Sequence, residues 1–162
     1  MRYVKLIIAI IIVCVTFSSC SILGGGQDKY FGFKKSEFTV IEEEDTHGGF
    51  LGDGWYYLIL DCSNNREQAM ELVKDWTPLP LSENLQKLMY DWKISTYEET
   101  FTLAEKGRWP TTNNCVYKFV DRNEEAVNKS DDTDLFNRKS FNFSIALYDL
   151  DTNTLYFVAY DT

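Results

Sequence analysis

The stretch from residue 141 to residue 160, FNFSIALYDLDTNTLYFVAY, decides the fold. Large apolar residues occupy alternate positions up to a polar break at Asp151-Thr152-Asn153, and the alternation resumes at Leu155. A period of two is typical of β-strands, and a short break containing Asp and Asn between two such runs predicts a hairpin. The end of this sequence is therefore expected to form two antiparallel strands.

Three more strands are predicted upstream of this hairpin. Residues 55–61, WYYLILD, are apolar on both faces of a strand, which indicates a central strand or one covered by helices. Residues 34–44 and 115–121 show weaker alternation, and residues 94–103 have an ambiguous pattern that also allows a strand. A glycine-rich connection separates the first two strands.

Two helices are expected between these strands. Asn64 with Glu67 resembles a capping box, and Ser82 can cap a second helix. Apolar residues follow at helical spacing: Ala69, Leu72, Val73 and Trp76 in the first, and Leu81, Leu85, Leu88, Met89 and Trp92 in the second. The pattern predicts an α+β domain, with an antiparallel sheet of about five strands and two helices packed on one face.

The composition excludes several classes of protein. The chain has 162 residues, of which 44% are hydrophobic and 25% charged, values that do not fit collagen-like, low-complexity or intrinsically disordered proteins. The net charge of −9 argues against a nucleic-acid partner and favours a cationic one, such as a basic protein or peptide. A single histidine, His47, leaves little basis for a histidine-rich metal site.

The N-terminus has the features of an export signal. Arg2 and Lys5 precede an apolar run over residues 6–17, which is too short to span a membrane comfortably. The sequence Phe17-Ser18-Ser19-Cys20 resembles the lipobox of bacterial lipoprotein precursors, with Phe in place of Leu at its first position and Ser before the cysteine.

That resemblance implies cleavage before Cys20 and a lipid anchor on its thiol. Residues 1–19 are then a signal peptide, residues 20–28 a lipidated cysteine and flexible tether, and residues 29–162 a single domain. The expected location is the extracytoplasmic face of the cell membrane, with the membrane contacted through the lipid. An uncleaved anchor and a simple secreted protein are the alternatives.

Four stretches of the domain are similar to small uncharacterised lipoproteins of Gram-positive bacteria. They are residues 47–54, 57–62, 79–85 and 149–156. This resemblance implies no activity and no cofactor, and it supports location and a single domain only.

Cys62 and Cys115 are the two cysteines left for the fold, because Cys14 leaves with the signal and Cys20 carries lipid. Outside the cytoplasm an even pair of cysteines is consistent with a disulfide, and two buried free thiols are the alternative.

The loop that begins at His47 is the best candidate for a ligand-binding site. Gly48 and Gly49 would let the backbone approach a ligand, and His47 with Asp53 could serve as acid and base or as metal ligands. The alternative is a glycine-rich turn with no ligand. The sequence Asp149-x-Asp-x-Asn lacks the glycine and glutamate of a calcium loop, so no metal site is assigned.

No serine or cysteine nucleophile motif accompanies His47, so no catalytic residue is assigned. The sequence therefore favours a non-catalytic binding or interaction module. The alternatives are an immunity-like or inhibitory lipoprotein that binds a basic protein, and a small cell-envelope hydrolase that uses the His47 loop.

Overall fold

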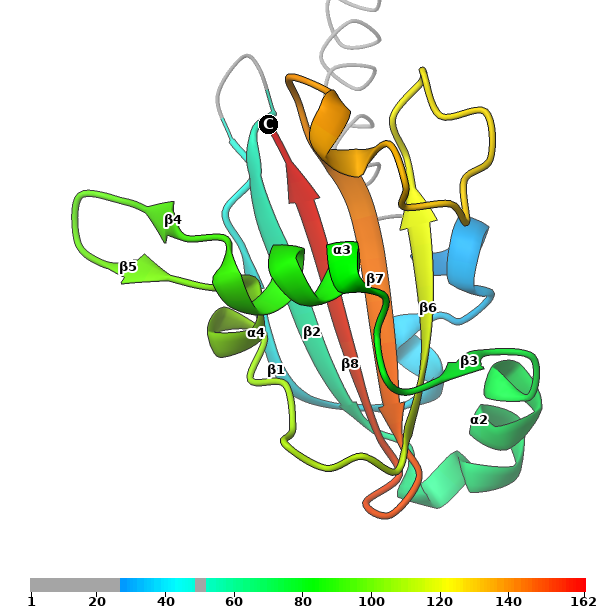
Figure 1. Ribbon diagram of the computed structural model, residues 1–162. Helices are drawn as coiled ribbons and strands as arrows, with labels where there is room; N and C mark the ends of the chain where they lie inside the picture. The colour runs from blue at the N-terminus through cyan, green and yellow to red at the C-terminus, as the bar shows by residue number, and fades with distance from the viewer. Residues whose placement is uncertain (1–26, 49–51) are drawn as a thin grey trace, which may run out of the picture.

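The computed structural model describes residues 27–48 and 52–162, which form an α+β structure (Figure 1). Its centre is a six-stranded antiparallel sheet in the order β1-β2-β8-β7-β6-β3. The strands are β1 (Thr39–Asp45), β2 (Gly54–Asp61), β3 (Thr77–Pro78), β6 (Cys115–Asp121), β7 (Asn142–Asp149) and β8 (Thr154–Asp161). A two-stranded sheet, β4 (Ile94–Ser95) and β5 (Thr100–Phe101), forms a separate hairpin. The predicted fold class is confirmed, and the strand number of about five was close.

The C-terminal hairpin is confirmed as predicted. Strands β7 and β8 pair in register from Asn142 opposite Asp161 to Asp149 opposite Thr154. One oxygen of Asp149, Oδ1, accepts hydrogen bonds from the backbone N–H groups of Asp151 at 2.9 Å and Thr152 at 3.3 Å. The acidic stretch thus closes a turn through its own backbone, which explains its composition without a cation.

The helical segments lie on both faces of the sheet, so the prediction of two helices on one face was wrong. On one face lie α3 (Glu83–Gln86), η4 (Lys87–Asp91) and α4 (Leu103–Lys106), and α3 crosses the front of the sheet in Figure 1. On the other lie η1 (Gln27–Phe31) and α2 (Arg66–Val73), which follows the short η3 (Ser63–Asn65). The remaining short helices are η2 (Lys35–Glu37) and η5 (Leu135–Asn137).

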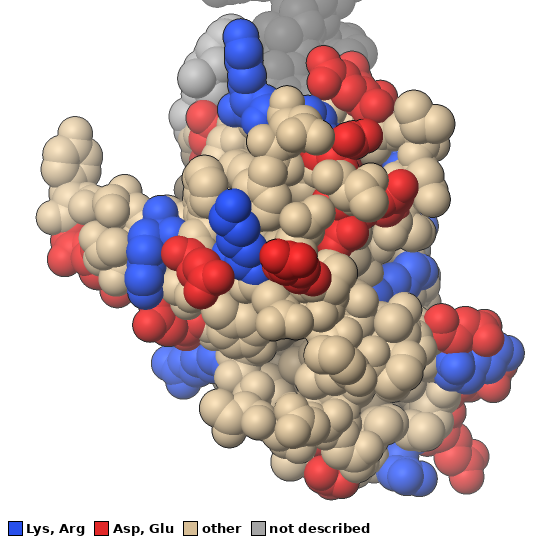
Figure 2. Space-filling view, in the orientation of Figure 1, with Lys and Arg blue, Asp and Glu red and all other residues tan. Residues whose placement is uncertain are grey.

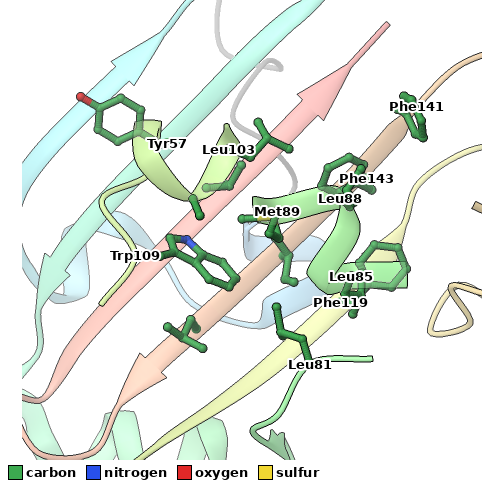
Figure 3. Close-up of a cluster of buried hydrophobic side chains, with 14 of the residues drawn as sticks. Tyr57, Leu81, Leu85, Leu88, Met89, Leu103, Trp109, Phe119, Phe141 and Phe143 are labelled. Carbon is green, nitrogen blue, oxygen red and sulfur yellow. The ribbon is translucent and has the colours of Figure 1, made fainter. Parts of the chain in front are cut away.

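This two-sided covering follows from the central strands. Strand β7 is buried on both faces along most of its length, and β2 and β8 nearly so. On the front face, Leu85, Leu88 and Met89 pack in one cluster with Ile145 and Leu147 (Figure 3). The rear face is covered by the segment before β1, with Phe31 and Phe33, and by the segment between β2 and β3, with Ala69, Val73 and Trp76. These residues pack with Leu58, Ala146 and Phe157, which alternate along β2, β7 and β8 with the residues of the front cluster. A sheet with apolar residues on both faces needs two covering layers.

Helix termini match the predicted caps in part. Ser82 Oγ accepts a hydrogen bond from the N–H of Leu85 at 3.1 Å, so it caps α3 as expected. The side chain of Asn65, next to the predicted cap Asn64, donates instead to the carbonyl of Glu37 at 2.5 Å, joining α2 to the segment before β1. Within residues 27–48 and 52–162, no helix is long and apolar enough to cross a membrane.

Cys62 and Cys115 are both free and buried, so the structure contradicts the disulfide alternative. Cys62 packs in the rear cluster and Cys115 in the front cluster. Cys62 follows the last residue of β2, and Cys115 is the first residue of β6. These two strands are three strand spacings apart in the sheet, or roughly 14 Å, whereas the Cα atoms of two disulfide-bonded cysteines lie within about 7 Å of each other.

Both thiols are expected to resist alkylation in the folded protein. Burial raises the pKa of Cys62 to about 12 and that of Cys115 to about 11. Because the thiolate is the reactive form, iodoacetamide at pH 8 should modify them at least roughly 100-fold more slowly than in the urea-unfolded chain. Peptide mass spectrometry measures both sites separately, and a Cys62–Cys115 linked peptide without reductant would contradict the structure.

Candidate functional site

His47 lies at the end of the sheet where β1 and β8 finish and β2 begins. Its side chain is only 5% exposed. Nδ1 lies 2.7 Å from Oδ1 of Asp45, the last residue of β1, and Nε2 lies 2.9 Å from Oδ2 of Asp161, the last residue of β8. The predicted loop residue is therefore held between two carboxylates that belong to two strands.

Asp161 also binds Arg122, the residue that follows β6. Arg122 Nη2 donates to both Asp161 oxygens and to the carbonyl of Phe143, each at 2.9 Å. Neither Asp161 nor Arg122 was predicted as part of this site. The result is a chain of polar contacts, Asp45–His47–Asp161–Arg122, that crosses the end of the sheet.

The two contacts of His47 define what its ring can do. A neutral imidazole donates from one nitrogen only, so the fully protonated ring is the form that donates to both carboxylates. A general base needs one nitrogen directed at a nucleophile or a substrate. In this arrangement both nitrogens of His47 serve Asp45 and Asp161, which makes the histidine a link between strand ends.

The other predicted residues of this loop do not converge on His47. Gly48 and Asp53 are exposed, and Gly49 lies outside the described residues. Burial, with a smaller contribution from the charge of Asp53, raises the pKa of Tyr160. Among the described residues, no group of three or more His, Cys, Asp or Glu side chains is arranged to hold a metal ion.

A glycine is required at the start of β2 for a structural reason. A Cβ atom at Gly54 would lie 2.8 Å from the backbone nitrogen of His47, which is too close for a methyl group. At Gly54 the backbone of the chain itself therefore makes a close approach to the residues before the loop.

The acidic residues of β1 are mostly paired. Glu42 lies 2.7 Å from Arg108 and accepts a hydrogen bond from the Tyr57 hydroxyl. Glu43 lies 2.7 Å from Lys35, whose hydrogen bond lowers the pKa of that carboxyl. Glu44 lies 3.6 Å from Lys106. This strand is therefore not an uncompensated acidic surface of the kind that a basic partner would recognise.

Exposed aromatic side chains gather elsewhere, on the segment from η4 to the β4–β5 hairpin. Tyr90 is 47% exposed, Trp92 38% and Tyr97 109%. The hairpin projects from the body of the protein (Figure 1). Trp92 was expected in the core stripe of the second helix, but the chain turns extended at this residue, and its ring packs against Phe136 and Phe141 near the surface.

Comparisons with protein-family models, with curated proteins and with solved structures found no match to this chain.

Replacing His47 with alanine is expected to lower the free energy of unfolding by about 1 to 2 kcal/mol. Hydrogen bonds to charged groups contribute about 1.5 to 3 kcal/mol each. The expected loss is smaller than two such bonds, because Asp45 is 41% exposed and can pair with water, and Asp161 keeps Arg122 as a partner. Urea unfolding followed by tryptophan fluorescence measures the change. Lys74→Ala, which removes only a contact to exposed Glu71, is the matched control and should leave the midpoint unchanged. An unchanged midpoint for His47→Ala would rule out the strand-linking role.

Proposed function

We propose that this protein is a membrane-anchored extracytoplasmic lipoprotein whose folded part binds another component of the cell envelope without catalysis. The observation that carries the binding role is the exposure of three aromatic side chains, Tyr90, Trp92 and Tyr97, within eight residues of the chain from η4 to the β4–β5 hairpin. Tyr and Trp are enriched in the energetically important parts of interfaces, because they offer large contact areas and a polar group at low entropy cost.

The anchor is supported by the sequence before the described residues. The apolar run 6–17 is followed by Phe17-Ser18-Ser19-Cys20, and the glycines after Cys20 would separate the domain from the bilayer. A lipid-modified cysteine with two or more acyl chains holds a protein at a membrane firmly, whereas one chain does so only reversibly.

The non-catalytic role is supported by the positions of the reactive groups that the sequence offered. Both nitrogens of His47 contact carboxylates, and both thiols lie in apolar clusters that raise their pKa. These groups serve the fold in this arrangement, whereas Tyr97 is fully exposed in the β4–β5 hairpin.

The anchor is tested by metabolic labelling with a palmitate analogue. The wild-type chain should be labelled and recovered with membranes, and Cys20→Ala should lose the label. Cys62→Ala is the matched control and should keep it. A Cys20→Ala protein that is still labelled would disprove lipidation at this residue.

The binding role is tested by photo-crosslinking in intact cells. A photoreactive phenylalanine at position 97 should give an adduct that Trp92→Ala removes, because the proposal assigns both side chains to the partner-binding surface. The same probe at position 74, on the exposed turn after α2, is the control. Adducts no stronger at 97 than at 74, or adducts that persist in Trp92→Ala, would contradict the proposal.

A further inference from the structure

A hollow lies beneath α3 and η4, beside Tyr90. Its volume is about 380 Å³. Its walls come from the segment after β3, from the helical segment and from the loop before β6: Leu79, Pro80, Leu81, Gln86, Tyr90 and Asn113. This volume is at the lower end of the range for small-molecule sites, so it suits one compact group.

The hollow is uncharged in a strongly charged protein. None of its six lining residues is charged, and residues 77–82 and 109–117 contain no Asp, Glu, Lys or Arg, although these residues make up 25% of the chain. The surface below α3 in Figure 2 is accordingly mostly tan. Because an ionised ligand would lose hydration here without gaining a counter-charge, the hollow favours a neutral ligand.

Three polar side chains at the hollow retain unused hydrogen-bonding capacity. Gln86 Nε2 donates to the carbonyl of Leu81 at 2.8 Å, which fixes the amide and leaves its oxygen without a partner among the described residues. The amide of Asn113 and the hydroxyl of Tyr90 likewise have no partner in the part of the chain that the structure describes. Each amide or hydroxyl can pair with a group that both donates and accepts.

We propose that this hollow binds one ring of a neutral saccharide. A sugar ring has an apolar C–H face and a rim of hydroxyl groups that donate and accept. The apolar face would lie against Tyr90, which is 47% exposed, and Pro80, while hydroxyls pair with Gln86 and Asn113. This inference depends on the proposed binding function and assigns that function a ligand class.

The polar groups favour a saccharide over an apolar side chain of a partner protein. Such a side chain would fill the hollow against Leu79 and Leu81 but would cover the amides of Gln86 and Asn113 without replacing their water. Unpaired amides oppose binding, because each loses hydrogen bonds to solvent. A hydroxyl-rich ring pairs with these amides and contacts the apolar wall at the same time.

The test is a titration of the full chain in detergent micelles with chitohexaose and cellohexaose, followed by calorimetry and by NMR of the Gln86 and Asn113 side-chain amides. At least one neutral oligosaccharide should bind and shift both amides. Tyr90→Ala should weaken binding by about tenfold, equivalent to about 1.4 kcal/mol. Tyr90→Phe should keep most of the affinity, because the ring face is retained. Val127→Ala, a truncation of an exposed side chain outside the hollow, should have no effect.

Several results would overturn the saccharide assignment. The first is that neither oligosaccharide binds at millimolar concentration, and the second is that Tyr90→Ala, shown by circular dichroism to be folded, binds with unchanged affinity. The third is that an anionic oligosaccharide binds equally well. The fourth is that a neutral proline-rich peptide, and not a saccharide, shifts the two amides. If the position-97 adduct forms and depends on Trp92 while the titration fails, the binding function stands and only the saccharide assignment falls.

Discussion

Replacing Arg138 with methionine is expected to destabilise the protein by about 3 to 5 kcal/mol, the usual cost of leaving one member of a buried ion pair without its partner. Arg138 Nη2 contacts Oδ2 of Asp121, and the side chains are only 12% and 1% exposed. The hydrogen bond to Asp121 raises the pKa of the guanidinium. Among the described residues the other Asp121 oxygen accepts only the N–H of Asn123, at 3.0 Å, and this donor cannot neutralise the carboxylate.

A double-mutant cycle separates this effect from lost packing. Methionine keeps much of the volume of the arginine stem, and Asp121→Asn removes the carboxylate charge at nearly constant shape. Because the second change removes the uncompensated charge, Asp121→Asn with Arg138→Met should recover part of the stability lost in Arg138→Met alone. Strictly additive effects by urea unfolding, or a cost near zero for Arg138→Met, would show that the pair is not buried as described.

The elements that could be predicted are those specified by local periodicity. The alternation around the Asp151-Thr152-Asn153 turn predicted β7 and β8, and Ser82 correctly predicted the start of α3. Helix α4 was not predicted, because the stretch 94–103, in which it begins, had a pattern that also allowed a strand. The sequence Thr102-Leu103-Ala104-Glu105 contains the capping-box signal, and in the structure Thr102 and Glu105 bond each other's backbone N–H groups.

The errors concern features that depend on which strands become neighbours. Placing both helices on one face assumed a sheet with one solvated side, although the apolar residues on both faces of 55–61 indicated two covering layers. The disulfide depended on the separation of β2 and β6, which is set by the two strands between them. No local pattern contains that information.

The residues of the candidate site could likewise not be brought together from local sequence patterns. His47 could be singled out because it is the only histidine, but Asp161 is 114 residues away and Arg122 follows a different strand. The uncharged segments 77–82 and 109–117 are visible in the sequence, yet only the fold places them together beside Tyr90. Local chemistry can thus be predicted from sequence, whereas its convergence on one site requires the sheet order.

The core of the rear face offers the second large effect. Replacing Phe157 with alanine is expected to lower the free energy of unfolding by about 3 to 5 kcal/mol, the range for buried phenylalanine truncations. Phe157 is 1% exposed, and its ring makes edge contacts with Phe31 at 5.2 Å, Tyr56 at 5.9 Å and Phe33 at 6.1 Å between centroids.

The identity of these partners predicts where the damage spreads. Phe31 and Phe33 belong to the segment that precedes β1, and Phe157 is the ring of β8 that holds both of them on the sheet. Amide hydrogen exchange in residues 29–38 should therefore accelerate in Phe157→Ala more than exchange in β7, which keeps its pairing with β6. Phe157→Leu, which retains most of the apolar volume, should cost less than about 1.5 kcal/mol and leave that segment protected. Uniform acceleration in both regions would mean that the segment before β1 does not depend on this ring for its attachment to the sheet.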